Sequence, residues 1–308
     1  MATNSPNDTD DSTTVPPRPM RDRLHRFAGS ARDVLLYSSA YLAFIAVAEV
    51  LIVTELLSLP LTPAPAIAGL LTFAVYGNDR VADVETDEQT TPARTAFIRR
   101  YDRRLYTLSA LAYGLAVALS VLGGPAAFAL ALVPGAIWVV YALDWLPFSG
   151  HVNRLKQIFI LNSVLVAGAW ALVVVLLPIA FAGAPVTLTA GVVCLTFFLA
   201  TFVDVEIPNV RDRASDREAG VKTLPVVLGV RGTRYALYGV TSLAAAVLVT
   251  AASDGLLTRP ETVLLLLCVG YLTVIVTCLG RVDDSGKLTV AAECSRLPML
   301  ALLVPPAV

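Results

Sequence analysis

A series of long apolar segments runs through most of the chain and determines its class of fold. Each has close to the ~20 apolar residues that an α-helix needs to cross ~30 Å of hydrocarbon. The segments cover residues 33–57, 61–78, 105–123, 125–143, 157–181, 186–207, 233–252, 261–280 and 288–306. The sequence therefore predicts an all-α, polytopic membrane protein built as a nine-transmembrane-helix bundle.

The composition excludes other classes of protein. The 308 residues are 56% hydrophobic and 15% charged, and the mean hydropathy is +0.71, whereas soluble domains are about 25% charged. This excludes a disordered chain and a disulfide scaffold, and a net charge of −1 gives no field that favours nucleic acid. All four cysteines lie in apolar segments without CxxC spacing, which indicates small buried hydrophobes.

The polar start and the basic residues predict the domain organisation and the topology. Residues 1–17 are polar and are predicted to be disordered, so residues 1–30 form a tail with a basic juxtamembrane stretch, and 31–308 form the transmembrane domain. If nine segments cross the membrane, 21 of the 23 basic residues fall on one side. By the positive-inside rule, the N-terminus and the long loops face the cytoplasm of a multi-pass cell-membrane protein.

Three aspartates follow the second apolar segment at helical spacing. Asp79, Asp83 and Asp87 stand at i, i+4 and i+8, so on a helix their carboxylates form one stripe. Like charges at this spacing destabilise an empty helix. A divalent cation with oxygen ligands would offset that repulsion.

A second acidic cluster follows the sixth apolar segment. Asp212 and Asp216 repeat the i, i+4 spacing, and Asn209 stands one turn earlier. Pro208 is expected to interrupt the helix, so that Asp204 and Glu206 need not share this face. Nearby arginines and a lysine add hydrogen-bond donors for an anion. Mg²⁺ prefers a few carboxylates together with phosphate oxygens. The two clusters together favour a diphosphate ligand with Mg²⁺.

These motifs resemble the UbiA-type intramembrane prenyltransferases, which have nine helices and two aspartate-rich motifs, NDxxDxxxD and DxxxD. The second motif is commonly followed by a stretch like GVKTLPV, which here is Gly220-Val-Lys-Thr-Leu-Pro-Val226. The first motif has one residue too many between Asn78 and Asp83. Either Asn78 is out of register, or Asp79 occupies the asparagine position, which preserves the stripe.

The resemblance implies a reaction and a site at a central cavity open to the cytoplasmic face. A polyprenyl group would pass from an allylic prenyl diphosphate to a lipophilic acceptor, such as a quinone precursor, a glyceryl phosphate lipid or a carotenoid, with Mg²⁺-dependent ionisation and release of diphosphate. The implied metal ligands are Asp79, Asp83, Asp87, Asp212 and Asp216. The implied catalytic cations are Arg94, Lys156 and Lys222, and the implied substrate-binding residues are Asn78, Tyr141, Arg154, Asn209 and Arg217.

Other readings of the charged residues stay open. A secondary transporter is the alternative function, although its coupling acids would be expected near the midplane rather than at one face. A non-enzymatic scaffold would not need paired aspartate stripes. Glu49 and Glu293 fall within predicted spans and are functional candidates. A pairing of Glu293 with Arg296 at i+3 explains the second equally well.

Overall fold

The computed structural model describes residues 31–82, 84, 88, 91–142, 159–282 and 285–303. Within these ranges the secondary structure is helical and no strand occurs, which confirms the all-α class. The tail of residues 1–30 lies outside the described residues, as do Asp83, Asp87, Arg154 and Lys156.

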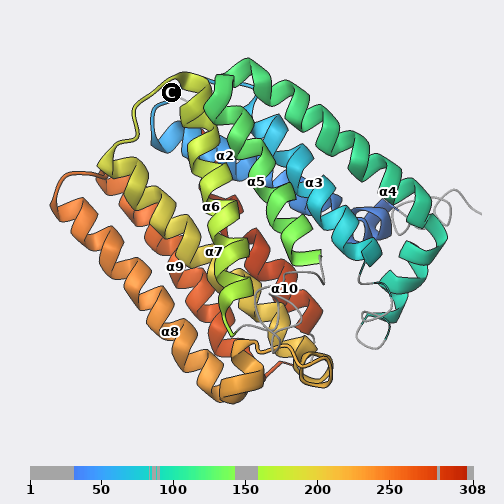
Figure 1. Ribbon diagram of the computed structural model, residues 1–308. Coiled ribbons are helices and arrows are strands. Elements are labelled where there is room, and N and C mark those ends of the chain that lie inside the picture. Colours follow the sequence, from blue (N-terminus) through green and yellow to red (C-terminus); the bar gives the residue numbers. More distant parts are fainter. Residues whose placement is uncertain are drawn as a thin grey trace, which may run out of the picture.

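The helices form a bundle in which neighbours along the chain pack against each other. In Figure 1, α8 and α9 lie along one side, α4 lies on the opposite side, and α6 and α7 run between them. The C-terminal segment η4 packs against α2, so the two ends of the described chain meet inside the bundle. The elements are α2 (Ala40–Leu56), α3 (Ala64–Ala82), α4 (Pro92–Ser120), η2 (Val121–Gly123), α5 (Gly124–Ala142), α6 (Leu161–Ala182), α7 (Leu188–Glu218), α8 (Leu224–Ser253), α9 (Arg259–Cys278), α10 (Ser285–Glu293) and the 3₁₀ helix η4 (Cys294–Leu303).

Five helical stretches of the described chain are long and apolar enough to span a membrane. A sixth counts if the short helix Ala31–Tyr37 and α2, which meet at a bend of 70°, form one broken span. One of the five is the stretch Pro92–Val139, which includes α4 and most of α5. The multi-pass membrane character is therefore supported, and the number of nine crossings stays a prediction.

The outer surface of the bundle carries apolar side chains at helical spacing. On α4, Leu108, Leu111 and Leu115 are each more than half exposed, and Leu243 and Val249 are similarly exposed on α8. A row of exposed leucines at i, i+3 and i+7 covers one side of a helix. These faces suit contact with lipid chains.

The last predicted segment, 288–306, differs from the helix that the structure contains. The α-helix α10 ends at Glu293, and the chain continues as the 3₁₀ helix η4, which includes Pro298. A proline cannot donate the backbone hydrogen bond of a helix interior. Ser295 and Arg296 are buried at this break, because their side chains turn toward the interior of the bundle.

The expected interruption at Pro208 is wrong. The helix α7 runs from Leu188 to Glu218 with Pro208 inside it. The proline leaves the carbonyl of Asp204 without its usual helical partner, at a cost of about 3 kcal/mol in an ordinary helix interior. Val203 and Ile207, which precede Pro208 on the same helix, are buried, and α6, α8, α9 and α10 all pack on α7. Tertiary packing therefore keeps the helix continuous, and Asp204 shares a helix with the second acidic cluster.

Candidate active site

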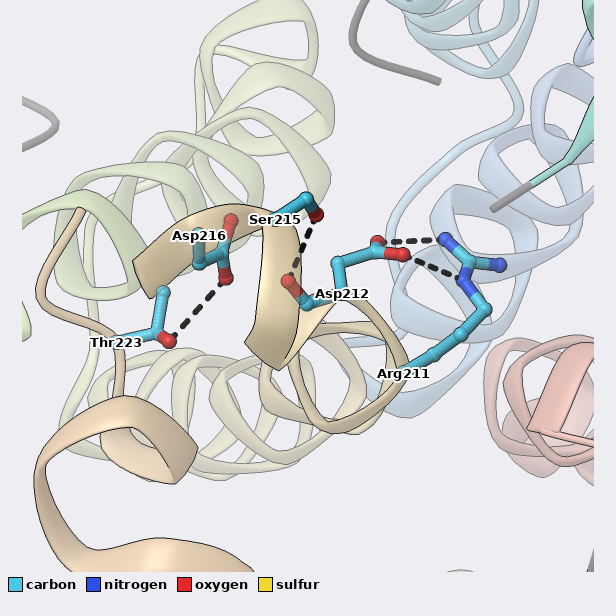
Figure 2. A network of polar contacts seen from close by, with 5 residues as sticks. All are labelled: Arg211, Asp212, Ser215, Asp216 and Thr223. Carbon is cyan, nitrogen blue, oxygen red and sulfur yellow. Dashed lines mark hydrogen bonds and ion pairs between the residues drawn. The ribbon is translucent and has the colours of Figure 1, made fainter. Parts of the chain in front are cut away.

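The second acidic cluster lies on the last turns of α7, where each carboxylate has its own partner. Arg211 donates two hydrogen bonds to Asp212, from Nε to Oδ1 and from Nη2 to Oδ2, both at 2.7 Å. Asp216 accepts a hydrogen bond of 3.3 Å from the Thr223 hydroxyl. Figure 2 shows that the Asp212 carboxylate points toward Arg211 and the Asp216 carboxylate toward Thr223. Both aspartates are partly exposed, so their oxygens lie at the surface of the bundle end.

Asn209 connects this cluster to the interior of the bundle. Its amide nitrogen donates a 3.2 Å hydrogen bond to Glu206 Oε2, and the hydroxyl of Ser163 on α6 donates one of 2.5 Å to Glu206 Oε1. Glu206 is fully buried. The two bonds hold the carboxylate against α6 and fix the orientation of the Asn209 side chain.

The first acidic cluster begins on the last turn of α3. Asn78, Asp79 and Arg80 are all partly buried there. The Asn78 Oδ1 oxygen is buried and has no hydrogen-bond partner in the described part of the chain. Arg80 donates a 3.2 Å hydrogen bond from Nε to the hydroxyl of Ser39. The end of α3 therefore presents polar groups close to the start of α2.

Glu293 on α10 shows that the ends of three helices converge. Its Oε2 accepts a 2.6 Å hydrogen bond from the hydroxyl of Tyr41. The same carboxylate interacts electrostatically with Arg80 of α3, Arg94 of α4 and Arg211 of α7. One carboxylate therefore interacts electrostatically with guanidinium groups from three distant parts of the sequence. The proposed pairing of Glu293 with Arg296 is wrong.

Deeper in the bundle, Arg296 joins two buried carboxylates. It forms ion pairs with Glu49 of α2 and with Asp204 of α7, the latter at 2.8 Å from Nη2 to Oδ2. The exposed fractions of the three side chains are 6% for Arg296, 0% for Glu49 and 7% for Asp204. Trp170 of α6 donates a 2.6 Å hydrogen bond to the second oxygen of Glu49. We call Glu49, Asp204, Trp170 and Arg296 the buried charge network.

A comparison with family models identifies the chain. The model described as the UbiA prenyltransferase family matches residues 35–291. The chain belongs to the UbiA prenyltransferase family. The resemblance drawn from the two acidic motifs is confirmed, and with it the class of enzyme, a prenyltransferase. A search of curated proteins found no match.

Solved structures of UbiA homologs have the same fold. An apo UbiA homolog from Aeropyrum pernix K1 aligns with a TM-score of 0.66 and 19% identity, over 85% of this chain and 97% of that one. A UbiA homolog from Archaeoglobus fulgidus bound to GPP and Mg²⁺ aligns with a TM-score of 0.62 and 14% identity, over 87% and 99%. A structure described under digeranylgeranylglyceryl phosphate synthase aligns with a TM-score of 0.55 and 14% identity, over 88% of this chain and 96% of that one. At these identities the likeness concerns the fold.

The structure describes some of the family's expected site residues and not others. Arg94 lies in the first turn of α4 and Tyr141 near the end of α5. Arg217 and Lys222 are exposed at the end of α7 and just after it. Asp83, Asp87, Arg154 and Lys156 lie outside the described residues, so their predicted roles stay predictions.

The polar atoms at this end of the bundle fit a hard cation with a phosphate ligand. In the described part of the chain, no three His, Cys, Asp or Glu side chains are grouped closely enough to hold a metal by themselves. Mg²⁺ does not need such a cage, since it takes one or two carboxylates together with phosphate oxygens and water. The partly exposed Asp212 and Asp216 and the unpartnered amide oxygen of Asn78 are oxygen ligands of the right kind.

The buried charge network has no signal as a unit in the sequence. Glu49 and Arg296 were each visible as ionisable residues within a predicted span, which is a signal for function or pairing. Their partnership joins residues 247 positions apart. Asp204 has no clear signal, because the expected interruption at Pro208 separates it from the face of the second acidic cluster.

Proposed function

We propose that this chain transfers a polyprenyl group from an allylic prenyl diphosphate to a lipophilic acceptor within the membrane. The family match over residues 35–291 carries this proposal. Two acidic motifs at the ends of α3 and α7 support it further, as do arginines of α3, α4 and α7 that interact electrostatically with Glu293. Nothing in these features favours the transporter alternative.

The donor and the ion are inferred by analogy and from the type of ligand present. Related structures from Archaeoglobus fulgidus are bound to GPP and Mg²⁺ and to DMAPP and Mg²⁺. In this chain, we infer that the Mg²⁺ ligands are Asp79, Asp83, Asp87, Asp212 and Asp216. Mg²⁺ would supply Lewis acidity that stabilises diphosphate as a leaving group.

The chain's own cations would bind the diphosphate and neutralise the charge that develops on it. We infer this role for Arg94, Lys156 and Lys222. Arg80 and Arg211, which like Arg94 interact electrostatically with Glu293, are further candidates. Fixed positive groups aimed at developing negative charge are the largest kind of electrostatic contribution to such a reaction. Asn78, Tyr141, Arg154, Asn209 and Arg217 are proposed to bind the rest of the substrate head.

The position in the bilayer determines the face to which the site opens and the class of acceptor that can reach it. Twenty-one of the 23 basic residues fall on one side of the predicted nine crossings. We therefore infer that the acidic motifs lie at the cytoplasmic face and that a central cavity opens to the same face. The acceptor is inferred to be a lipophilic molecule such as a quinone precursor, a glyceryl phosphate lipid or a carotenoid. The likeness to the digeranylgeranylglyceryl phosphate synthase structure is compatible with the second of these.

Release of diphosphate from geranylgeranyl diphosphate in membranes that contain the protein tests this function. We expect release that requires Mg²⁺ and that falls at least 100-fold in Asp212→Asn, because the variant loses a charged metal ligand. Asp254→Asn is the matched control, since Asp254 is exposed at the end of α8 away from both motifs and should keep full activity. Absence of release by the wild-type protein, or equal activity of the two variants, would contradict the function.

A further inference from the structure

The buried charge network lies on α7 below the second acidic motif. Asp204 precedes Asp212 by eight residues, which is ~12 Å along a helix and ~80° around it. Tyr76 interacts electrostatically both with Asp79, at the end of α3, and with Asp204. The network therefore lies about two turns of α7 further into the bundle than the second acidic motif, on the side where the hydrocarbon part of a bound donor would extend.

This region contains buried polar atoms that lack partners. Asp204 Oδ1, Arg296 Nη1, Thr201 Oγ1 and Ser295 Oγ are all buried and make no hydrogen bond within the described chain. Thr201 is one turn before Asp204 on α7, and Ser295 is next to Arg296. Native proteins leave few such atoms unsatisfied, and a concentration of them marks a place where a ligand or water belongs. Asp204 is more than nine-tenths buried.

The buried charge network contains two carboxyl groups and one guanidinium. Arg296 is the one cation shared by Glu49 and Asp204. Both oxygens of Glu49 are satisfied, one by Arg296 and the other by Trp170. One guanidinium therefore serves two carboxyl groups, and Asp204 Oδ1 is unpartnered within the described residues. A buried carboxylate of this kind favours a positive charge nearby, because the apolar surroundings screen it weakly.

Aromatic rings border the same place. The ring of Tyr76 packs edge-on against Trp170, with 6.4 Å between the centroids, and the guanidinium of Arg296 lies 5.7 Å from the centre of the Phe197 ring. Aromatic faces attract cations and exclude water. The surroundings of Asp204 therefore suit a cation that must be kept from water.

We propose that Asp204, held in place by Arg296, is a further catalytic residue that stabilises the allylic cation formed from the donor. The proposal rests on the proposed function. The carbon–oxygen bond of the donor breaks, the electron pair leaves with diphosphate, and the positive charge is spread over the allylic carbons. Asp204 forms no bond and takes no proton in this step. Its carboxylate lowers the energy of the positive charge as it develops.

Asp204→Asn tests the proposal, because the amide keeps the size of the side chain and removes its charge. Two quantities are measured with geranylgeranyl diphosphate and Mg²⁺: the dissociation constant of the donor and the single-turnover rate of diphosphate release. We expect the rate to fall about 100-fold, as for loss of one preorganised electrostatic group, while the dissociation constant changes less than threefold. Asp204→Glu keeps the charge but displaces it by one methylene, and should lose only about tenfold.

Glu261→Gln is the matched control, since it makes the same carboxylate-to-amide change at the start of α9, outside both motifs. Its rate should match that of the wild type. A rate for Asp204→Asn within threefold of wild type, or a dissociation constant that rises in step with the lost rate, overturns the proposal. If Asp204→Asn does not fold, Asp204→Thr, which also lacks the charge, takes its place, and a rate within threefold of wild type overturns the proposal. An inactive wild-type protein would refute the proposed function instead.

Discussion

Gly77 determines how closely α3 approaches α4, just before the first acidic motif. A Cβ atom at this position would lie 2.2 Å from the Ser109 hydroxyl oxygen and 3.5 Å from the Ser109 Cβ. Ser109 is fully buried, and its hydroxyl makes no hydrogen bond within the described chain. The close contact therefore involves one oxygen atom that contributes no hydrogen bond to stability.

A double-mutant cycle checks this contact. Gly77→Ala should lower the free energy of unfolding by about 1–3 kcal/mol, the usual cost of overpacking a core. Ser109→Ala by itself should change stability little, and the double variant should recover most of the loss because the clashing oxygen is gone. Thermal unfolding in detergent measures all three variants. Equal losses in Gly77→Ala and the double variant would show that the oxygen is not the cause.

At the scale of elements, α9 begins with a capping box. The Glu261 side chain accepts a 2.7 Å hydrogen bond from the backbone nitrogen of Thr258, and the Thr258 side chain accepts one from the backbone of Glu261 in return. Glu261→Ala should lower the free energy of unfolding by about 1 kcal/mol. Diphosphate release should be unchanged, because this end of α9 lies outside the acidic motifs. Glu261→Gln should retain the stability, and an equal loss in both variants would contradict the role of the cap.

At the same scale, Pro208 interrupts the backbone hydrogen bonds of α7 without ending the helix. Pro208→Ala restores a backbone N–H that can bond to the Asp204 carbonyl, so α7 should gain about 1 kcal/mol of stability. Pro260→Ala is the control, because Pro260 lies in the first turn of α9, where the N–H has no helical acceptor. Thermal unfolding compares the two. A gain in Pro260→Ala and none in Pro208→Ala would contradict this account of α7.

At the scale of the whole molecule, the buried charge network joins elements from both ends of the chain. Arg296 of η4 bridges Glu49 of α2 and Asp204 of α7, and Trp170 adds α6. Arg296→Met should lower the free energy of unfolding by about 3–5 kcal/mol, because two buried carboxylates lose their cation. The triple variant with Glu49→Gln and Asp204→Asn should recover part of that loss in a thermal melt. A melting temperature of Arg296→Met equal to that of the wild type would refute the structural role of Arg296.

Much of the architecture could be predicted because its signals are local. A run of ~20 apolar residues must satisfy its backbone groups as a helix in lipid whatever its neighbours are. The all-α class and the family of the chain therefore followed from segment composition and from the spacing of Asp212, Asp216 and the residues up to Pro225. Asp79 and Asp212 could be named as site residues for the same reason, since the i, i+4 spacing is a property of a single helix.

The tertiary structure alone decided which charges meet. Arg296 pairs with Glu49 and Asp204 rather than with Glu293 three residues away, because η4 turns its side chain into the bundle. Pro208 remains inside α7 because four other helices pack on that helix. Local spacing gives the faces of one helix, whereas partners far apart in sequence depend on how the helices pack. That packing brought Asp204 and Glu49 to the same guanidinium, that of Arg296.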